Sequence, residues 1–115
     1  MSDGLIYHMC RRREWQNAER VGAYHGSSQD AAGGFIHFST ASQLAQSAAK
    51  HRAGQSDLVL VAVAPAALGE TLRWEAARNG ALFPHLYGTL ALDAVRWVRD
   101  LPLAADGRHR IPPLD

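Results

Sequence analysis

The sequence predicts an α+β fold, with two helices in its N-terminal half and a mostly antiparallel set of strands. Two segments between residues 13 and 52 carry apolar residues at helical spacing. After residue 57 the apolar runs are short, rich in strand formers and separated by glycine or proline. At 115 residues the chain has the length of one domain, and we expect an extended tail from about residue 102.

The first quarter of the chain contains a strand, a helix and a loop. Leu5–Met9 is short and apolar and predicts the first strand. Arg13–Arg20 has helical spacing, and Gly22 is placed to end that helix in a left-handed conformation. Residues 24–33 are polar, small and glycine-containing, so we expect a mobile loop.

A second strand–helix unit follows this loop. Gly34–Thr40 is apolar except for one histidine and predicts a strand, after which a helix runs from Ala41 to about Arg52. Thr40 and Gln43 have the spacing of a capping box, in which each side chain binds the other's backbone N–H group. The predicted buried side of this helix consists of Leu44, Ala45, Ala48 and Ala49.

Four strands are expected in the second half of the chain. Asp57–Ala64 is almost entirely apolar, which predicts a central strand covered on both faces. Thr71–Glu75 alternates polar with apolar residues, as a half-exposed strand does. Phe83–Gly88 contains Pro84 and is expected at a sheet edge or as an irregular strand. Ala94–Arg99 alternates again and predicts the last strand.

Composition narrows the class of protein. The net charge is +1, and the short basic runs Arg11–Arg13 and Arg108–Arg110 are typical of solvated surface, so nucleic acid is not an expected general partner. Cys10 is the only cysteine, which excludes an intrachain disulfide and fits a reducing cytoplasm. No apolar run approaches the roughly 18 residues of a membrane span, so we expect a cytoplasmic protein without a membrane partner.

Three histidines occupy apolar, strand-like segments: His8, His37 and His85. Imidazole both donates and accepts protons near neutral pH, so we predict that these three rings share an aromatic-walled cleft as catalytic candidates. The alternative is that each is a core residue with its hydrogen bonds satisfied. Their spacing matches no zinc-ligand pattern, and we expect no metal.

The other site candidates are ring and polar side chains near these histidines in the predicted strands, namely Tyr7, Ser39, Thr40, Arg73, Glu75 and Tyr87. Tyr7 and Tyr87 are candidates to stack on a flat ring, or else fill the core. Arg73 and Glu75 lie on one face of their strand, where Arg73 could bind phosphate or form a surface ion pair with Glu75. Ser39 is a candidate ligand contact, whereas Thr40 is also explained as a helix cap.

Several of these segments together resemble a bacterial domain-of-unknown-function family, number 952. The resemblance runs from about Leu5 to Leu101, and the order and spacing of the motifs match. The segments that carry it are Ile6-Tyr7-His8, Gly34 to Thr40, Asp57 to Val61, Leu72-Arg73-Trp74-Glu75 and Phe83 to Gly88.

That family in turn resembles the ADP-ribosyltransferase fold, in which a split sheet clamps NAD. The resemblance implies that His8 holds a ribose and that His37 lies under the nicotinamide. Where the fold usually supplies a catalytic glutamate, the segment 83–88 offers His85 and Tyr87 instead. This is similar to a branch with two histidines and a non-acidic third position, which includes RNA 2'-phosphotransferases.

Three functional hypotheses follow. In the first, the cleft binds NAD or a related ADP-ribose or phosphorylated nucleotide, with NAD as cofactor and an ADP-ribosyl- or phosphotransferase activity. In the second, the protein is a non-catalytic module for a small anionic metabolite or a protein partner, as the missing glutamate favours. In the third, the three histidines serve a metal-dependent hydrolase. Among nucleic acids, only an RNA end is a candidate partner.

Overall fold

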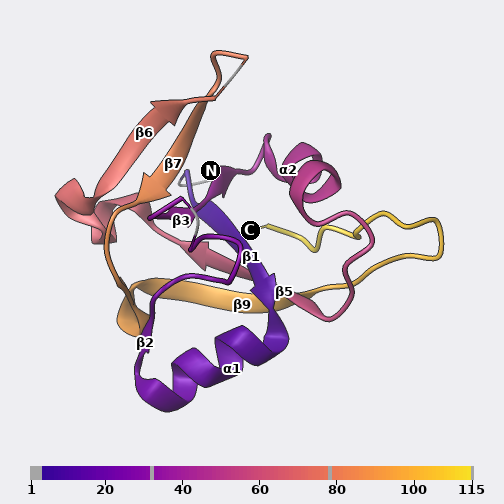
Figure 1. Ribbon diagram of the computed structural model, residues 1–115, viewed down its shortest axis with the longest axis horizontal. Helices are drawn as coiled ribbons and strands as arrows, with labels where there is room; N and C mark the ends of the chain where they lie inside the picture. The colour runs from indigo at the N-terminus through magenta and orange to yellow at the C-terminus, as the bar shows by residue number, and fades with distance from the viewer. Residues whose placement is uncertain (1–3, 32, 78, 115) are drawn as a thin grey trace.

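The computed structural model describes residues 4–31, 33–77 and 79–114. It confirms the α+β fold: the helices α1 (Arg12–Val21) and α2 (Leu44–His51) both lie in the N-terminal half, and every strand pairing is antiparallel (Figure 1). Neither α1, with 10 residues, nor α2, with 8, is long enough to cross a membrane, and the described residues contain no other α-helix.

A four-stranded sheet forms the centre of the molecule. Its strands run in the order β4 (Ser39–Thr40), β1 (Ile6–Arg11), β5 (Leu58–Val63) and β9 (Val95–Leu101). All six residues of β5 are buried, which confirms the prediction of a strand covered on both faces. Alternate β5 residues belong to two cores: Val59, Val61 and Val63 share one with α1, and Leu58, Leu60 and Ala62 share the other with α2.

The end of α1 is set by glycine, as predicted. Gly22 has a φ of 97° and its N–H donates to the Ala18 carbonyl at 2.7 Å. That left-handed conformation favours glycine because a Cβ would clash with the backbone. Trp15 and Ala18 form the buried face of the helix.

The helix α2 begins later than predicted. The Thr40 N–H donates to the Gln43 side-chain oxygen at 3.0 Å, but the Thr40 hydroxyl lies 3.3 Å from the Ser42 hydroxyl instead of capping the helix. Only half of the predicted capping box therefore forms. The buried side chains are Leu44, Ser47 and Ala48, whereas Ala45 and Ala49, which were expected on this face, are exposed.

The predicted single strand Gly34–Thr40 is wrong, because the segment passes from one sheet to another. Its first part, β3 (Ile36–His37), pairs with β7 (Leu82–Leu86) in a three-stranded sheet of order β3-β7-β6, where β6 is Leu72–Ala76. Its second part, β4, pairs with β1. Phe38 connects the two and donates its N–H to the Pro84 carbonyl at 3.0 Å. This short crossover brings the two sheets together beside His37.

The strand containing Pro84 is the middle strand of its sheet, not an edge. The backbone groups of Pro84 point toward β3, since its carbonyl accepts from Phe38. Because these groups point away from β6, the missing proline N–H removes no bond from the ladder with β6. The β6–β7 hairpin projects from the rest of the molecule (Figure 1).

Short elements complete the part of the chain that the structure describes. β2 (Ala23–Tyr24) pairs with β8 (Leu90–Ala91), and three 3₁₀ helices cover Pro65–Ala67, Gly69–Thr71 and Leu92–Ala94. No helix is assigned between residues 102 and 114, where an antiparallel bridge joins Leu103 and His109.

Candidate functional site

A cleft of about 610 Å³ opens between the two larger sheets and α2. Its lining comes from β1, the loop before β3, the β3–β4 crossover, α2 and the β6–β7 hairpin. His37 and His85 face each other across paired strands, with ring centroids 5.5 Å apart. Pockets that bind small molecules have this order of size.

His37 is held by the buried carboxylate of Asp30, which is 4% exposed. One carboxylate oxygen lies 2.6 Å from His37 Nδ1 and accepts the His37 N–H at 3.0 Å. The other accepts the N–H and the hydroxyl of Ser27, at 2.6 and 2.8 Å. Burial acts to raise the pKa of Asp30, but the hydrogen bond from His37, the proximity of His8 and the two N–H donors outweigh it and hold the pKa well below its usual range.

His8 lies beneath this pair and is 2% exposed. Its Nδ1 is 2.6 Å from the His37 carbonyl, which can only accept, so Nδ1 carries the proton. Its Nε2 lies 2.6 Å from the Tyr24 hydroxyl and accepts from it. Burial lowers the pKa of His8 more than Asp30 raises it, so the ring is neutral. His8 therefore fixes the backbone that presents His37.

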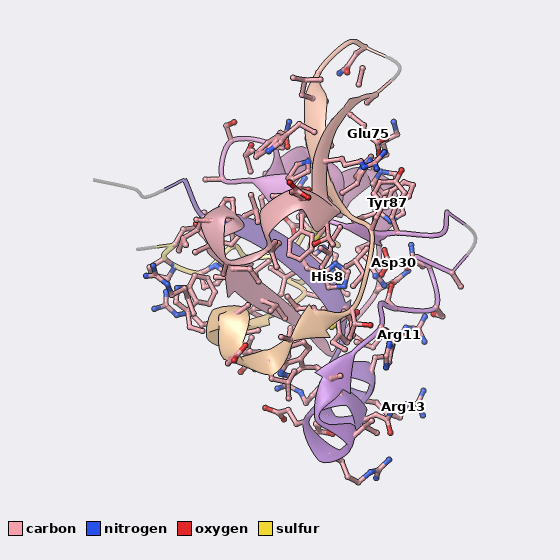
Figure 2. All side chains as sticks on the ribbon, turned by 90° about the vertical axis from the view of Figure 1, so that its left-hand side faces the viewer. His8, Arg11, Arg13, Asp30, Glu75 and Tyr87 are labelled. Atoms are coloured by element: carbon pink, nitrogen blue, oxygen red, sulfur yellow. The ribbon has the colours of Figure 1, made fainter. Side chains whose placement is uncertain are left out.

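A second carboxylate–histidine pair lies on the hairpin. Glu75 on β6 accepts from His85 Nδ1 and from the Tyr87 hydroxyl, both at 2.7 Å. The hydrogen bond from His85, and to a smaller extent that from Tyr87, lowers the pKa of Glu75. The carboxylate in turn raises the pKa of Tyr87. Figure 2 shows Glu75 and Tyr87 on the hairpin, with Asp30 below them and His8 nearer the centre of the view.

Phe35 joins the two pairs into one aromatic cluster. Its ring stacks on His85 with centroids 4.1 Å apart and lies 4.5 Å from His37 and 5.1 Å from Tyr87. In both imidazoles, therefore, Nδ1 is hydrogen-bonded to a carboxylate, and the Phe35 ring packs against the imidazole. Among the described residues, neither Nε2 has a hydrogen-bond partner.

The last turn of α2 supplies one cation, Lys50, and one imidazole, His51, to the cleft. Lys50 and His51 line it and are exposed. Arg52, at 4% exposure, is committed to the protein interior: it donates to the Met9 carbonyl at 2.8 Å and to the Ser27 hydroxyl at 3.2 Å. Arg52 therefore braces the Asp30 loop, while Lys50 and His51 face whatever occupies the cleft.

The remaining predicted site residues occupy different places. Tyr7 and Ser39 line the cleft from the interior; Tyr7 is 2% exposed and Ser39 donates its hydroxyl to Ser47 at 2.8 Å. Thr40 lies outside the cleft lining, and its N–H donates to the Gln43 side chain. The Arg73 guanidinium lies 5.3 Å from the centre of the Tyr87 ring, outside the cleft lining.

Sequence reasoning missed Asp30 and Phe35, the two residues that organise the cleft. Asp30 lies in the segment expected to be a mobile loop, yet it is buried. The spacing Ser27-x-x-Asp30 was the available signal, since a hydroxyl residue followed three positions later by a carboxylate often forms a reciprocal turn. Phe35 gave no signal beyond its strand propensity.

No three His, Cys, Asp or Glu side chains within the described ranges are grouped closely enough to hold a metal ion. The chain is thus an α+β protein whose two larger antiparallel sheets and α2 enclose a histidine-lined cleft. It belongs to the family described as protein of unknown function (DUF952), which its residues 9–98 match.

Solved structures of one bacterial protein share this fold. The chain is similar to protein CC0527 from Caulobacter crescentus, whose crystal structure is 48% identical, covers 92% of this chain and 93% of that one, and has a TM-score of 0.88. The solution NMR structure of CC0527 is 49% identical over 90% of each chain, with a TM-score of 0.80. No curated protein matches the chain.

Proposed function

We propose that the cleft binds a phosphorylated nucleotide of the NAD and ADP-ribose class. One observation carries the proposal: two imidazoles, each oriented by a carboxylate, share a cleft with the exposed ammonium group of Lys50 and the imidazole of His51. The Nε2 atom of a neutral imidazole accepts from a ribose hydroxyl, and an imidazolium or ammonium group donates to phosphate oxygens. The choice of NAD and ADP-ribose among such ligands rests on the sequence resemblance to ADP-ribosyltransferases.

The geometry suggests a division of roles within this site. His37 and His85 present their free Nε2 atoms to the ligand, because their Nδ1 atoms are bonded to Asp30 and Glu75. His8 positions His37 and has no free nitrogen for a ribose. In this proposal, therefore, His37 makes the ribose contact that the sequence resemblance implied for His8.

The outer edge of the site lies on the hairpin. Tyr87, which is 38% exposed, and Arg73, next to its ring, extend from the His85 pair toward solvent. They are suited to contact the part of a ligand that protrudes from the cleft. Ser39 and Tyr7 shape its floor.

Isothermal titration calorimetry with NAD, ADP-ribose and adenosine tests the proposal. We expect both phosphorylated ligands to bind and adenosine to bind at least tenfold more weakly, because it lacks the phosphates that Lys50 attracts. His37→Ala should lose binding, and His25→Ala, an exposed histidine outside the cleft lining, should retain it. Failure of both phosphorylated ligands to bind at millimolar concentration would contradict the proposal.

A non-catalytic module remains the second candidate, and Glu75 favours it. This carboxylate accepts from both His85 and Tyr87, so it is engaged rather than free to contact a ribose. Measurement of nicotinamide release from NAD separates the two candidates. Binding without release supports the module, whereas release that depends on His37 supports the transferase.

A further inference from the structure

We propose that His37 and His85 form a general base–general acid pair that cleaves an RNA phosphodiester, with the neighbouring ribose 2'-hydroxyl as nucleophile. The inference rests on the proposed function only in requiring that the same cleft accept a phosphorylated nucleotide. It goes beyond that function by naming a reaction and by giving each histidine a step.

The two carboxylate–histidine pairs have the arrangement that proton transfer requires. In each pair the carboxylate can only accept, so Nδ1 carries a proton and Nε2 is the atom that exchanges protons with a ligand. A transferring group must lie within about 2.6–3.2 Å of its proton donor or acceptor. With ring centroids 5.5 Å apart, both histidines can reach the oxygens around one phosphorus atom.

The assignment of base and acid follows from the two carboxylates. Asp30 is buried, accepts four hydrogen bonds and is held ionised, so it stabilises the imidazolium that forms when His37 takes up a proton. Glu75 is more exposed and divides its charge between His85 and Tyr87. His37 therefore acts as the base, and protonated His85 acts as the acid.

The reaction balances without another reagent. The 2'-hydroxyl gives its proton to His37 Nε2, and its oxygen forms a new bond to phosphorus. The bond between phosphorus and the 5'-oxygen breaks, and that oxygen takes the proton from His85 Nε2. The products are a 2',3'-cyclic phosphate and a 5'-hydroxyl end, and proton exchange with water restores both histidines.

The hydroxyl and thiol groups of the protein near the cleft are poor nucleophiles, which favours a nucleophile supplied by the substrate. The Ser39 hydroxyl donates to Ser47 and the Ser27 hydroxyl donates to Asp30. The Cys10 thiol is fully buried, and burial raises its pKa to about 12, so it is unreactive. Each of these three candidate nucleophiles is therefore engaged or shielded.

A second hollow, which contains two arginines, favours an RNA strand over a single nucleotide as the ligand. This hollow, of about 400 Å³, is lined by Arg11 and Arg13 at the start of α1 and by Gln55, Ser56 and Asp57. The Asp57 carboxylate is paired with Arg12 at 2.9 Å, which leaves the two arginines to act on a ligand. The Gln55 amide donates to Gln29 at 3.0 Å, and Gln29 lines the cleft, so the hollow and the cleft adjoin. Figure 2 shows Arg11 and Arg13 on the same side of the molecule as Asp30. An adjacent backbone phosphate can therefore reach them.

The test compares the diribonucleotide ApA with its analogue that has a 2'-deoxyribose in the first position. We expect the protein to bind both and to convert only ApA to the cyclic phosphate, which ³¹P NMR detects. Loss of one proton-transfer group should lower kcat about 10²–10⁴-fold in His37→Gln and His85→Gln. The rate should follow a bell-shaped pH profile in the wild-type protein and in His25→Ala, purified in the same way.

The outcomes separate the two proposals. Binding of both dinucleotides without cleavage of ApA would overturn the acid–base inference and leave the nucleotide-binding proposal standing. Cleavage that persists at the wild-type rate in folded His37→Gln and His85→Gln would also overturn it, because the activity would come from elsewhere. If neither dinucleotide nor NAD binds, both proposals fail.

The cationic hollow has its own arm of the test. The double variant Arg11→Ser, Arg13→Ser should raise KM for the tetranucleotide ApApApA and weaken its salt dependence, while kcat stays unchanged. ApA should show a smaller change, since it has a single phosphate. An unchanged KM for the tetranucleotide would overturn the extension of the site to a strand.

Discussion

The two larger sheets of this protein differ in what they bury. In the four-stranded sheet, all six residues of β5 are buried and both faces pack against a core. In the β6–β7 hairpin, Trp74 and Leu82 are 45% and 53% exposed, and the opposite face carries His85 and Glu75. The first sheet supplies the stability of the fold, and the second can present titratable groups because it contributes less to the core.

The two carboxylate–histidine pairs show the same contrast on the scale of single residues. Asp30 accepts four hydrogen bonds inside the protein, whereas Glu75 accepts two at the surface. A buried carboxylate leaves several donors unsatisfied when it is removed, and water replaces an exposed one. Removal of the carboxylate should therefore destabilise the protein more in the Asp30–His37 pair than in the Glu75–His85 pair.

The largest expected effect comes from Asp30→Asn. The amide oxygen can replace only one carboxylate oxygen, so the donors of either Ser27 or His37 face an NH2 group, and the free energy of unfolding should fall by about 3–5 kcal/mol. Urea denaturation followed by circular dichroism measures the change. Glu75→Gln is the matched variant on the hairpin and should shift the midpoint much less. Equal shifts in the two variants would remove the distinction between the pairs.

The comparison can also be tested with two leucines. Leu60→Ala in β5 should lower the free energy of unfolding by about 2–5 kcal/mol, because the side chain is fully buried. Leu82→Ala, at 53% exposure, should change it by no more than about 0.5 kcal/mol. Chemical denaturation measures both. A large loss in Leu82→Ala would mean that the hairpin tip is covered in solution.

The smallest effect concerns pH and the buried histidine beneath the cleft. The pKa of His8 is lowered by burial, so below its ordinary value of 6.5 the unfolded chain binds a proton that the folded protein does not. The free energy of unfolding should therefore fall on acidification, by up to about 1.4 kcal/mol per pH unit for that proton. Denaturation curves between pH 7 and 5 measure this slope.

The pH experiment has two control variants. Burial also lowers the pKa of His51, but this side chain is far more exposed, so His51→Gln should keep most of the slope. His8→Gln should remove most of it. If the dependence of the free energy of unfolding on pH survives in His8→Gln and disappears in His51→Gln, the titrating group is His51. That result would contradict the neutral state of His8.

Sequence reasoning found the histidines but not what orients them. His37 and His85 were visible because an imidazole in an apolar strand is unusual. The roles of Asp30 and Glu75 depend on contacts between separate segments; Asp30, for example, lies seven positions before its partner His37. A loop that looked polar and mobile gave no indication that its carboxylate would be buried.

The sequence by itself determined the α+β class, the position of α1 and its terminal glycine, and the fully buried β5. It also indicated three histidines that line the cleft, His8, His37 and His85. These follow from periodicity and backbone preference, which act over neighbouring residues. Only the tertiary structure decided that Gly34–Thr40 divides between two sheets, that Pro84 lies in a middle strand and that His8 is sealed beneath His37. Strand partners and burial depend on contacts between distant segments, and a local pattern does not specify them.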